Sequence, residues 1–70
     1  MNLLESLTRR EYEVLSLLSK GKQNKEIARS LNITEHTVEQ HLKSIYRKLT
    51  VCNRVEASRL FWIYNAREEK

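Results

Sequence analysis

Apolar residues recur along this chain at steps of three and four positions, the spacing that collects side chains on one face of an α-helix. The pattern predicts four helices, over residues 9–19, 25–31, 35–49 and 54–66. Their expected inner faces are Val14, Leu15 and Leu18; Ile27, Ala28 and Leu31; Val38, Leu42, Ile45 and Leu49; and Ala57, Leu60, Phe61 and Tyr64. We therefore expect an all-α fold, a compact four-helix single domain over residues 1–70 with a lead-in (1–6) and a frayed tail (67–70).

Polar residues mark where these helices should begin. The side chains of Thr8, Asn24, Thr34 and Asn53 can each accept a hydrogen bond from the first turn of the helix that follows. Glu11 and Glu56 lie three positions after the first and last of these, which is the spacing of a capping box. Gly21 and Asn32 tolerate positive φ, so we expect them to end the first two helices.

Glu11 has a second interpretation, because it falls on the apolar side of the first helix. The local interpretation is the capping box with Thr8. The alternative is a partly buried ion pair with an arginine such as Arg54. Both remain open at the level of sequence.

The composition limits the classes of function. Seventy residues form one small domain with little room for a deep active-site cleft. One Gly and no Pro disfavour a many-stranded sheet, and one Cys excludes an intrachain disulfide or a four-Cys zinc site. No nucleophile–base set, Gly-rich phosphate loop or metal cluster is evident, so we expect neither an enzyme nor a cofactor or metal. The longest apolar run, residues 60–64, is too short for a bilayer and no signal peptide is evident, so we expect a cytoplasmic protein without a membrane partner.

Positive charge is concentrated in the middle of the chain. The formal net charge is +4, and residues 20–48 carry all of it, with seven Lys and Arg against three Glu. A basic segment between neutral ends is typical of a surface that binds a polyanion.

The same segment has the plan of a helix-turn-helix: a short helix, a tight turn and a longer helix. Small Ala28 lets the second of these helices cross the first closely. At about 100° per residue, the side of residues 35–49 opposite Val38 collects His36, Gln40, Lys43 and Arg47, with Thr37 and Glu39 at its flanks. Gln can bond adenine, Arg or Lys guanine, and Glu cytosine. The alternative is an ordinary solvated helix face.

Phosphate contacts would surround such a helix. Lys22, Lys25 and Lys48 lie where they could meet the DNA backbone, and the N–H groups at the starts of the second and third helices are natural anion sites.

Many identities at fixed distances resemble one known family over residues 7–61. They are Leu7-Thr8-Arg9-Arg10-Glu11, Glu13-Val14-Leu15, Gly21, Asn24-Lys25-Glu26-Ile27-Ala28, Leu31-Asn32-Ile33, Thr37-Val38, His41, Arg47-Lys48-Leu49, Val51, Asn53-Arg54 and Ala57. They are similar to the LuxR-type (NarL/FixJ, GerE-like) DNA-binding domain. The resemblance implies a domain that regulates transcription by binding double-stranded DNA as a homodimer, with the third helix in the major groove and the fourth at the dimer contact.

The resemblance also assigns residues. It implies base contacts at Glu39, Gln40 and Lys43, to which the helical projection adds Arg47 and His36, and backbone contacts near Asn24, Lys25, Thr34 and Thr37. Two positions depart from the family pattern. Thr50 stands where Gly is common, and because Thr disfavours positive φ we expect the third helix to end differently. Glu39 could read a cytosine or repel phosphate.

The fourth helix has apolar residues on both sides. One side closes the core, and Val55, Trp62, Ile63 and Ala66 line the other. Either Leu3 and Leu4 cover this second side, or a second copy does, in a two-fold dimer through Val55, Arg59, Trp62 and Ile63.

For the cysteine, His41 and the three tyrosines, we prefer a structural interpretation to a functional one. Cys52 is expected to be half-buried, with a redox sensor as the alternative. His41 is expected to be a hydrogen-bonded structural residue, and His36 to contact DNA or water and not a metal. Tyr12, Tyr46 and Tyr64 are expected to pack and not to stack on single strands.

Sequence-specific binding of duplex DNA is thus the leading function, and a helical module that binds protein is its rival. The chain could act as a free-standing regulator or as the output domain of a response regulator, with an upstream receiver or ligand-binding domain.

Overall fold

The computed structural model describes the backbone of residues 3–68 and the side chains of residues 3–65. A short 3₁₀ helix, η1 (Leu3–Ser6), precedes four α-helices: α1 (Arg9–Ser19), α2 (Asn24–Leu31), α3 (Glu35–Leu49) and α4 (Arg54–Glu68). Within this range there is no strand. The all-α expectation is confirmed.

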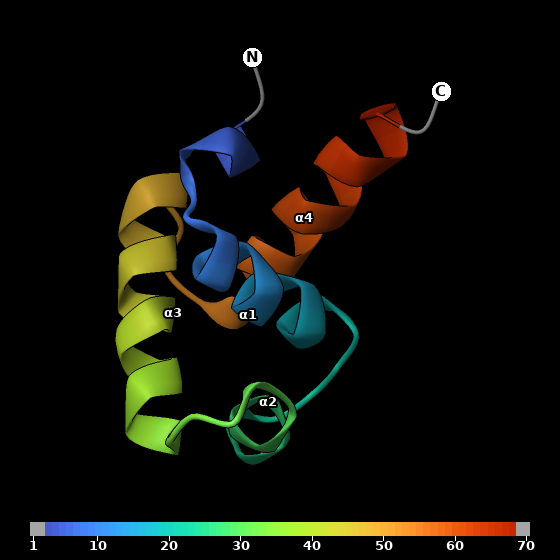
Figure 1. Ribbon diagram of the computed structural model, residues 1–70. Coiled ribbons are helices and arrows are strands. Elements are labelled where there is room, and N and C mark those ends of the chain that lie inside the picture. Colours follow the sequence, from blue (N-terminus) through green and yellow to red (C-terminus); the bar gives the residue numbers. More distant parts are fainter. Residues whose placement is uncertain (1–2, 69–70) are drawn as a thin grey trace.

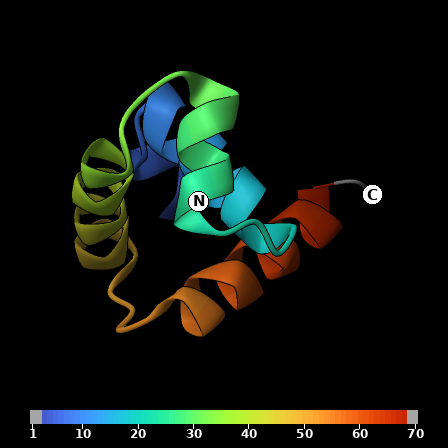
Figure 2. The same cartoon turned by 90° about the horizontal axis from the view of Figure 1, so that it is seen from below.

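Helix α1 occupies the centre of the arrangement. It packs against α3 on one side and α4 on the other, and α2 lies across the N-terminal end of α3 (Figures 1 and 2). The predicted inner faces form one core, in which Leu15, Ile27 and Ile45 have no exposed surface. Leu4 of η1 joins this core, whereas Leu3 is 42% exposed.

The helix starts agree with the sequence at three of four places. The Thr8 hydroxyl accepts the Glu11 N–H (3.1 Å), and the Glu11 carboxylate accepts the Thr8 N–H (2.9 Å), so the capping box is present. Thr34 caps α3 by accepting the Thr37 N–H (3.1 Å). Asn53 accepts the Glu56 N–H (3.0 Å). The Glu56 carboxylate, however, bonds the N–H of Cys52 and not that of Asn53 (2.8 Å).

The prediction of Asn24 as an N-cap was wrong, because α2 begins one residue earlier. Gln23 holds the extended backbone of the cap position, and Asn24 is the first helical residue. The physical reason is Glu26, whose carboxylate reaches back to the Gln23 N–H (2.9 Å) and stabilises a start one position upstream.

Three helices end in the same way. Gly21, Asn32 and Thr50 have φ of 88°, 57° and 57°, respectively. In each case the next N–H bonds a carbonyl five residues back: Lys22 to Leu17 (3.2 Å), Ile33 to Ala28 (2.9 Å) and Val51 to Tyr46 (3.0 Å). This is the Schellman pattern, in which an apolar residue after the turn often packs back on the helix.

The expectation that Thr50 would end α3 differently was therefore wrong. Val51, which is partly buried against the core, makes the closing hydrogen bond and holds Thr50 in the left-handed region. Helix α4 also continues to Glu68, beyond the expected end near Ala66. Of the predicted tail, residues 67 and 68 are thus helical, and residues 69–70 lie outside the described residues.

Candidate nucleic-acid interface

The crossing of α2 and α3 is fixed by small and branched apolar residues. Ala28 and Ile27 of α2 are buried, as is Val38 of α3. The left-handed turn at Asn32 reverses the chain between the two helices, and Ile33 packs against the core beneath it. This is the helix-turn-helix that the sequence predicts, with one side of α3 against the core and the other outside the bundle (Figure 2).

The predicted base-reading residues all lie on the outside of α3. His36, Gln40, Lys43 and Arg47, which we call the outer ridge, are exposed, and so is Glu39 beside them. Within the described part of the chain, the outer-ridge side chains make no hydrogen bond or ion pair with other residues. The ridge is therefore held by the backbone of α3, with donors and acceptors directed to solvent.

The predicted phosphate contacts divide into two groups. Lys22 and Lys25 are exposed beside the start of α2, and Thr34 is exposed at the start of α3. Thr37 and Asn24 are half-buried. The Thr37 hydroxyl lies 2.9 Å from the Thr34 hydroxyl, and the Asn24 Oδ1 is buried with no hydrogen-bond partner among the described residues.

Lys48 has an internal partner that the sequence analysis did not assign to it. Its Nζ lies 2.7 Å from Glu11 Oε1, and its side chain is 31% exposed. The other carboxylate oxygen of Glu11 accepts the Ser44 hydroxyl (2.7 Å). Glu11 thus forms both the capping box and an ion pair, and the pair is with Lys48 and not with Arg54. Arg54 instead donates to the backbone carbonyl of Lys22 (2.9 Å).

The hydrogen bonds to Glu11 determine the pKa of its carboxyl group. Burial by itself would raise the pKa of the Glu11 carboxyl, but the hydrogen bonds from Lys48, from the Thr8 N–H and from Ser44, with the charge of Lys48, lower it from the usual 4.5 to about 2. The carboxylate is therefore charged and fully bonded at neutral pH.

The outer side of α4 is apolar and open. Val55, Trp62 and Ile63 are 63%, 52% and 45% exposed, and Arg59 is exposed among them. Leu4 packs into the core and η1 packs against α3, so the lead-in leaves these residues exposed. Trp62 is anchored nonetheless, because its indole N–H donates to the Ser19 carbonyl (3.1 Å).

The remaining singled-out residues have ordinary surroundings. Cys52 is exposed and not half-buried, since the 50–53 connection runs over the surface. His41 is half-buried. Tyr12 packs its ring 5.6 Å from that of Phe61, and Tyr46 and Tyr64 are partly buried against the core. Burial raises the pKa of Tyr46, although the nearby Arg54 acts to lower it.

The described residues contain neither a metal-binding cluster nor a helix that could span a membrane. Among them, no three His, Cys, Asp or Glu gather to hold a metal ion. Similarly, none of the helices described has the length and apolar character that a membrane span requires.

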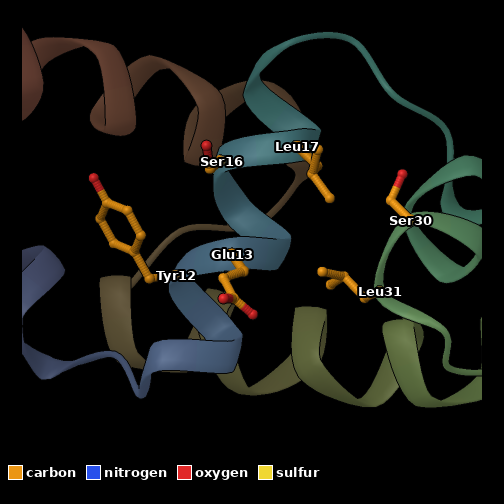
Figure 3. A pocket seen from close by; sticks show the side chains of 6 residues that line it. All are labelled: Tyr12, Glu13, Ser16, Leu17, Ser30 and Leu31. Carbon is orange, nitrogen blue, oxygen red and sulfur yellow. The ribbon is translucent and has the colours of Figure 1, made fainter.

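A groove that the sequence did not indicate lies between α1 and α2. It has a volume of about 360 Å³ and is lined by Tyr12, Glu13, Ser16, Leu17, Ser30 and Leu31 (Figure 3). Leu17 and Leu31 face each other across it. One signal in the sequence could have indicated this groove: Leu17 is apolar but lies outside the predicted inner face of the first helix.

The sequence is similar to a family of known proteins. Residues 5–61 match the family model for bacterial regulatory proteins of the luxR family. The glycerol metabolism activator of Pseudomonas putida is 51% identical over 55 residues, covering 79% of this chain and 25% of that protein. The nitrate/nitrite response regulator protein NarP of Escherichia coli is 51% identical over 79% of this chain and 26% of its own length.

A relative from another lineage is similar to the same degree. The transcriptional regulatory protein LiaR of Bacillus subtilis is 50% identical over 77% of this chain and 26% of its own length. The chain thus spans about a quarter of the length of these curated relatives.

Proposed function

The chain belongs to the LuxR family of bacterial regulatory proteins, a family of DNA-binding transcription regulators, and we propose that it binds duplex DNA sequence-specifically with α3 in the major groove. The observation that carries this proposal is the outer ridge. Four polar side chains with base-reading chemistry stand exposed on one side of a helix whose other side is buried. In the groove, Gln40 is suited to adenine, Lys43 and Arg47 to guanine, and Glu39 to cytosine, while His36 lies at the N-terminal end of the ridge.

Phosphates on either side of the groove would meet the starts of α2 and α3. Lys22 and Lys25 supply positive charge there, and backbone N–H groups near Asn24 and Thr34 supply donors at the positive ends of the helix dipoles. The Thr37 N–H itself is taken up by the Thr34 cap, so Thr37 would meet a phosphate through its hydroxyl. These contacts fix the position of α3 on the duplex and carry no sequence information by themselves.

The first experiment is a selection of bound duplexes from a random pool, followed by titration of the selected duplex and of a random-sequence duplex. Gln40→Ala should weaken the selected duplex selectively, because its loss removes a base contact. Lys25→Ala should weaken both duplexes alike and reduce the salt dependence, because it removes a phosphate contact. Arg9→Ala removes a positive charge from α1 and serves as the charge control. A domain that binds no duplex, or all duplexes equally, would refute the proposal.

A protein-binding module is the alternative, and salt separates the two. Each phosphate contact should lower the logarithm of the binding constant by about 0.9 per tenfold rise in salt. Binding to an apolar protein surface would show no such slope.

We propose further that the domain pairs through α4. Val55, Arg59, Trp62 and Ile63 form one exposed stripe, and a two-fold contact through it would place two copies of α3 on half-sites about one helical turn of DNA apart. Ile63→Glu and Trp62→Glu should both abolish association in sedimentation. Ile63→Glu is the cleaner variant, because Trp62 also bonds the Ser19 carbonyl. Unchanged association in both would refute pairing through this stripe.

The relatives support a proposal for the whole protein. Several are response regulators, so we propose that this domain works either alone or as the output part of a protein with a receiver or ligand-binding domain upstream. It would act on DNA in the cytoplasm, and no cofactor is needed for the contacts described.

A further inference from the structure

The Glu11 carboxylate joins two helices at their polar boundary. From the first turn of α1 it accepts hydrogen bonds from Ser44 and Lys48, which lie one turn apart on α3. It also accepts a hydrogen bond from the Thr8 N–H, which fixes its position relative to the start of α1. The residue is only 6% exposed, although it is charged.

Ser44 and Lys48 lie beside the outer ridge. At 100° per residue, Ser44 is about 40° around α3 from Gln40, and Lys48 is about 40° further on. The two anchors are about 6 Å apart along the helix axis. A rotation of α3 by about 40° would therefore present Ser44 to the DNA groove in place of Gln40.

The buried apolar side chains Val38, Leu42 and Ile45 decide which side of α3 faces the core. Hydrogen bonds add a directional constraint to this packing, because they weaken steeply with distance and angle. Two charge-assisted bonds of 2.7 Å from one fixed carboxylate define both the rotation and the axial position of α3.

The same contact holds the charge of Lys48 away from the DNA. Moving this ammonium to a phosphate would leave a buried carboxylate without its charge partner, which is strongly unfavourable. We propose that Glu11 is a positioning residue that determines specificity: it sets the rotation of α3 through Ser44 and Lys48 and withholds Lys48 from phosphate. This inference rests on the proposed function, since it concerns the same helix in the groove.

Three variants test the proposal, each with the folded fraction measured by circular dichroism under the binding conditions. Glu11→Gln should weaken the selected duplex at least tenfold, leave the random-sequence duplex unchanged or tighter, and steepen the salt slope by about 0.9 because Lys48 is released to a phosphate. Glu13→Gln is the matched control, since it removes the same charge from the same helix at a position that, within the described part of the chain, forms ion pairs only with Arg9 and Arg10.

Lys48→Met and Ser44→Ala keep the proposal testable if Glu11→Gln does not fold. Both should weaken the selected duplex with no change in salt slope. If Lys48 contacts phosphate, Lys48→Met will instead weaken both duplexes alike and reduce the slope by about 0.9, which overturns the inference. Equal affinity of all variants for the selected duplex also overturns it. Failure of the unsubstituted domain to bind either duplex would refute the proposed function itself.

Discussion

Acid should destabilise this domain through one carboxylate. Glu11 has a pKa of about 2 in the folded state against the usual 4.5, because the bonds from Lys48, Thr8 and Ser44 outweigh the effect of burial. A carboxyl whose pKa is lowered on folding stabilises the fold above its unfolded pKa, and this stabilisation is lost as pH falls toward its folded pKa. The loss should therefore run between about pH 4.5 and pH 2.

The size of the effect follows from the same shift. At about 1.4 kcal/mol per pKa unit, the lowered pKa corresponds to about 3 kcal/mol of stability at neutral pH. A domain of 70 residues has a total free energy of unfolding of about 4–10 kcal/mol. One protonation therefore removes a large fraction of it. Lys48 is 31% exposed, so salt should reduce the part that comes from its charge.

Urea denaturation of the unsubstituted domain and of Glu11→Gln, followed by circular dichroism at several pH values, measures this directly. The difference between the two free energies of unfolding isolates Glu11, because the other carboxyl groups cancel. It should be about 3 kcal/mol at pH 7 and shrink by about 1.4 kcal/mol per pH unit below pH 4.5. Glu13→Gln should show a small difference at every pH. A difference for Glu11→Gln that stays constant down to pH 2 would refute the reasoning.

Three further predictions concern the scaffold. Thr50→Gly should stabilise the domain by about 1 kcal/mol, or raise Tm by about 4–8 °C, because it relieves a β-branched residue at a φ of 57°, whereas Asn32→Gly at the same φ should change Tm much less. Equal shifts in thermal melting would contradict this. Asn53→Ala should cost about 1 kcal/mol in urea denaturation by removing the cap of α4, and Asn53→Ser should restore most of it; no loss would show that the cap is dispensable. Ala28→Leu should cost about 1–3 kcal/mol by forcing α2 from α3, and an unchanged melting temperature would mean that the crossing is loose.

The helices themselves could be predicted because their signals are local. Apolar spacing, the Thr8–Glu11 box and the positive φ of Gly21 and Asn32 all depend on residues a few positions apart, and all are present. Two local signals competed at the start of α2, where Glu26 favours Gln23 as the cap over Asn24. At Thr50 the residue preference was overridden by the closing bond of Val51, which depends on packing against the core.

In the candidate interface, too, local features could be predicted from the sequence and features that depend on packing could not. The outer ridge could be predicted from helix geometry alone, since its residues only need to point away from Val38. The partner of Glu11 could not, because Lys48 and Arg54 are both distant in sequence and the crossing of α1 and α3 decides between them. The sequence also predicted that Lys48 contacts the DNA backbone, whereas in the structure its ammonium group is bound to the Glu11 carboxylate.

Because the outer ridge makes no bonds to the rest of the described chain, its side chains are nearly independent of the scaffold beneath them. Exchanging such residues usually changes stability by less than about 0.5 kcal/mol. Under the proposed function, a few substitutions at positions 36, 40, 43 and 47 would therefore change the DNA sequence that is bound while the fold stays intact.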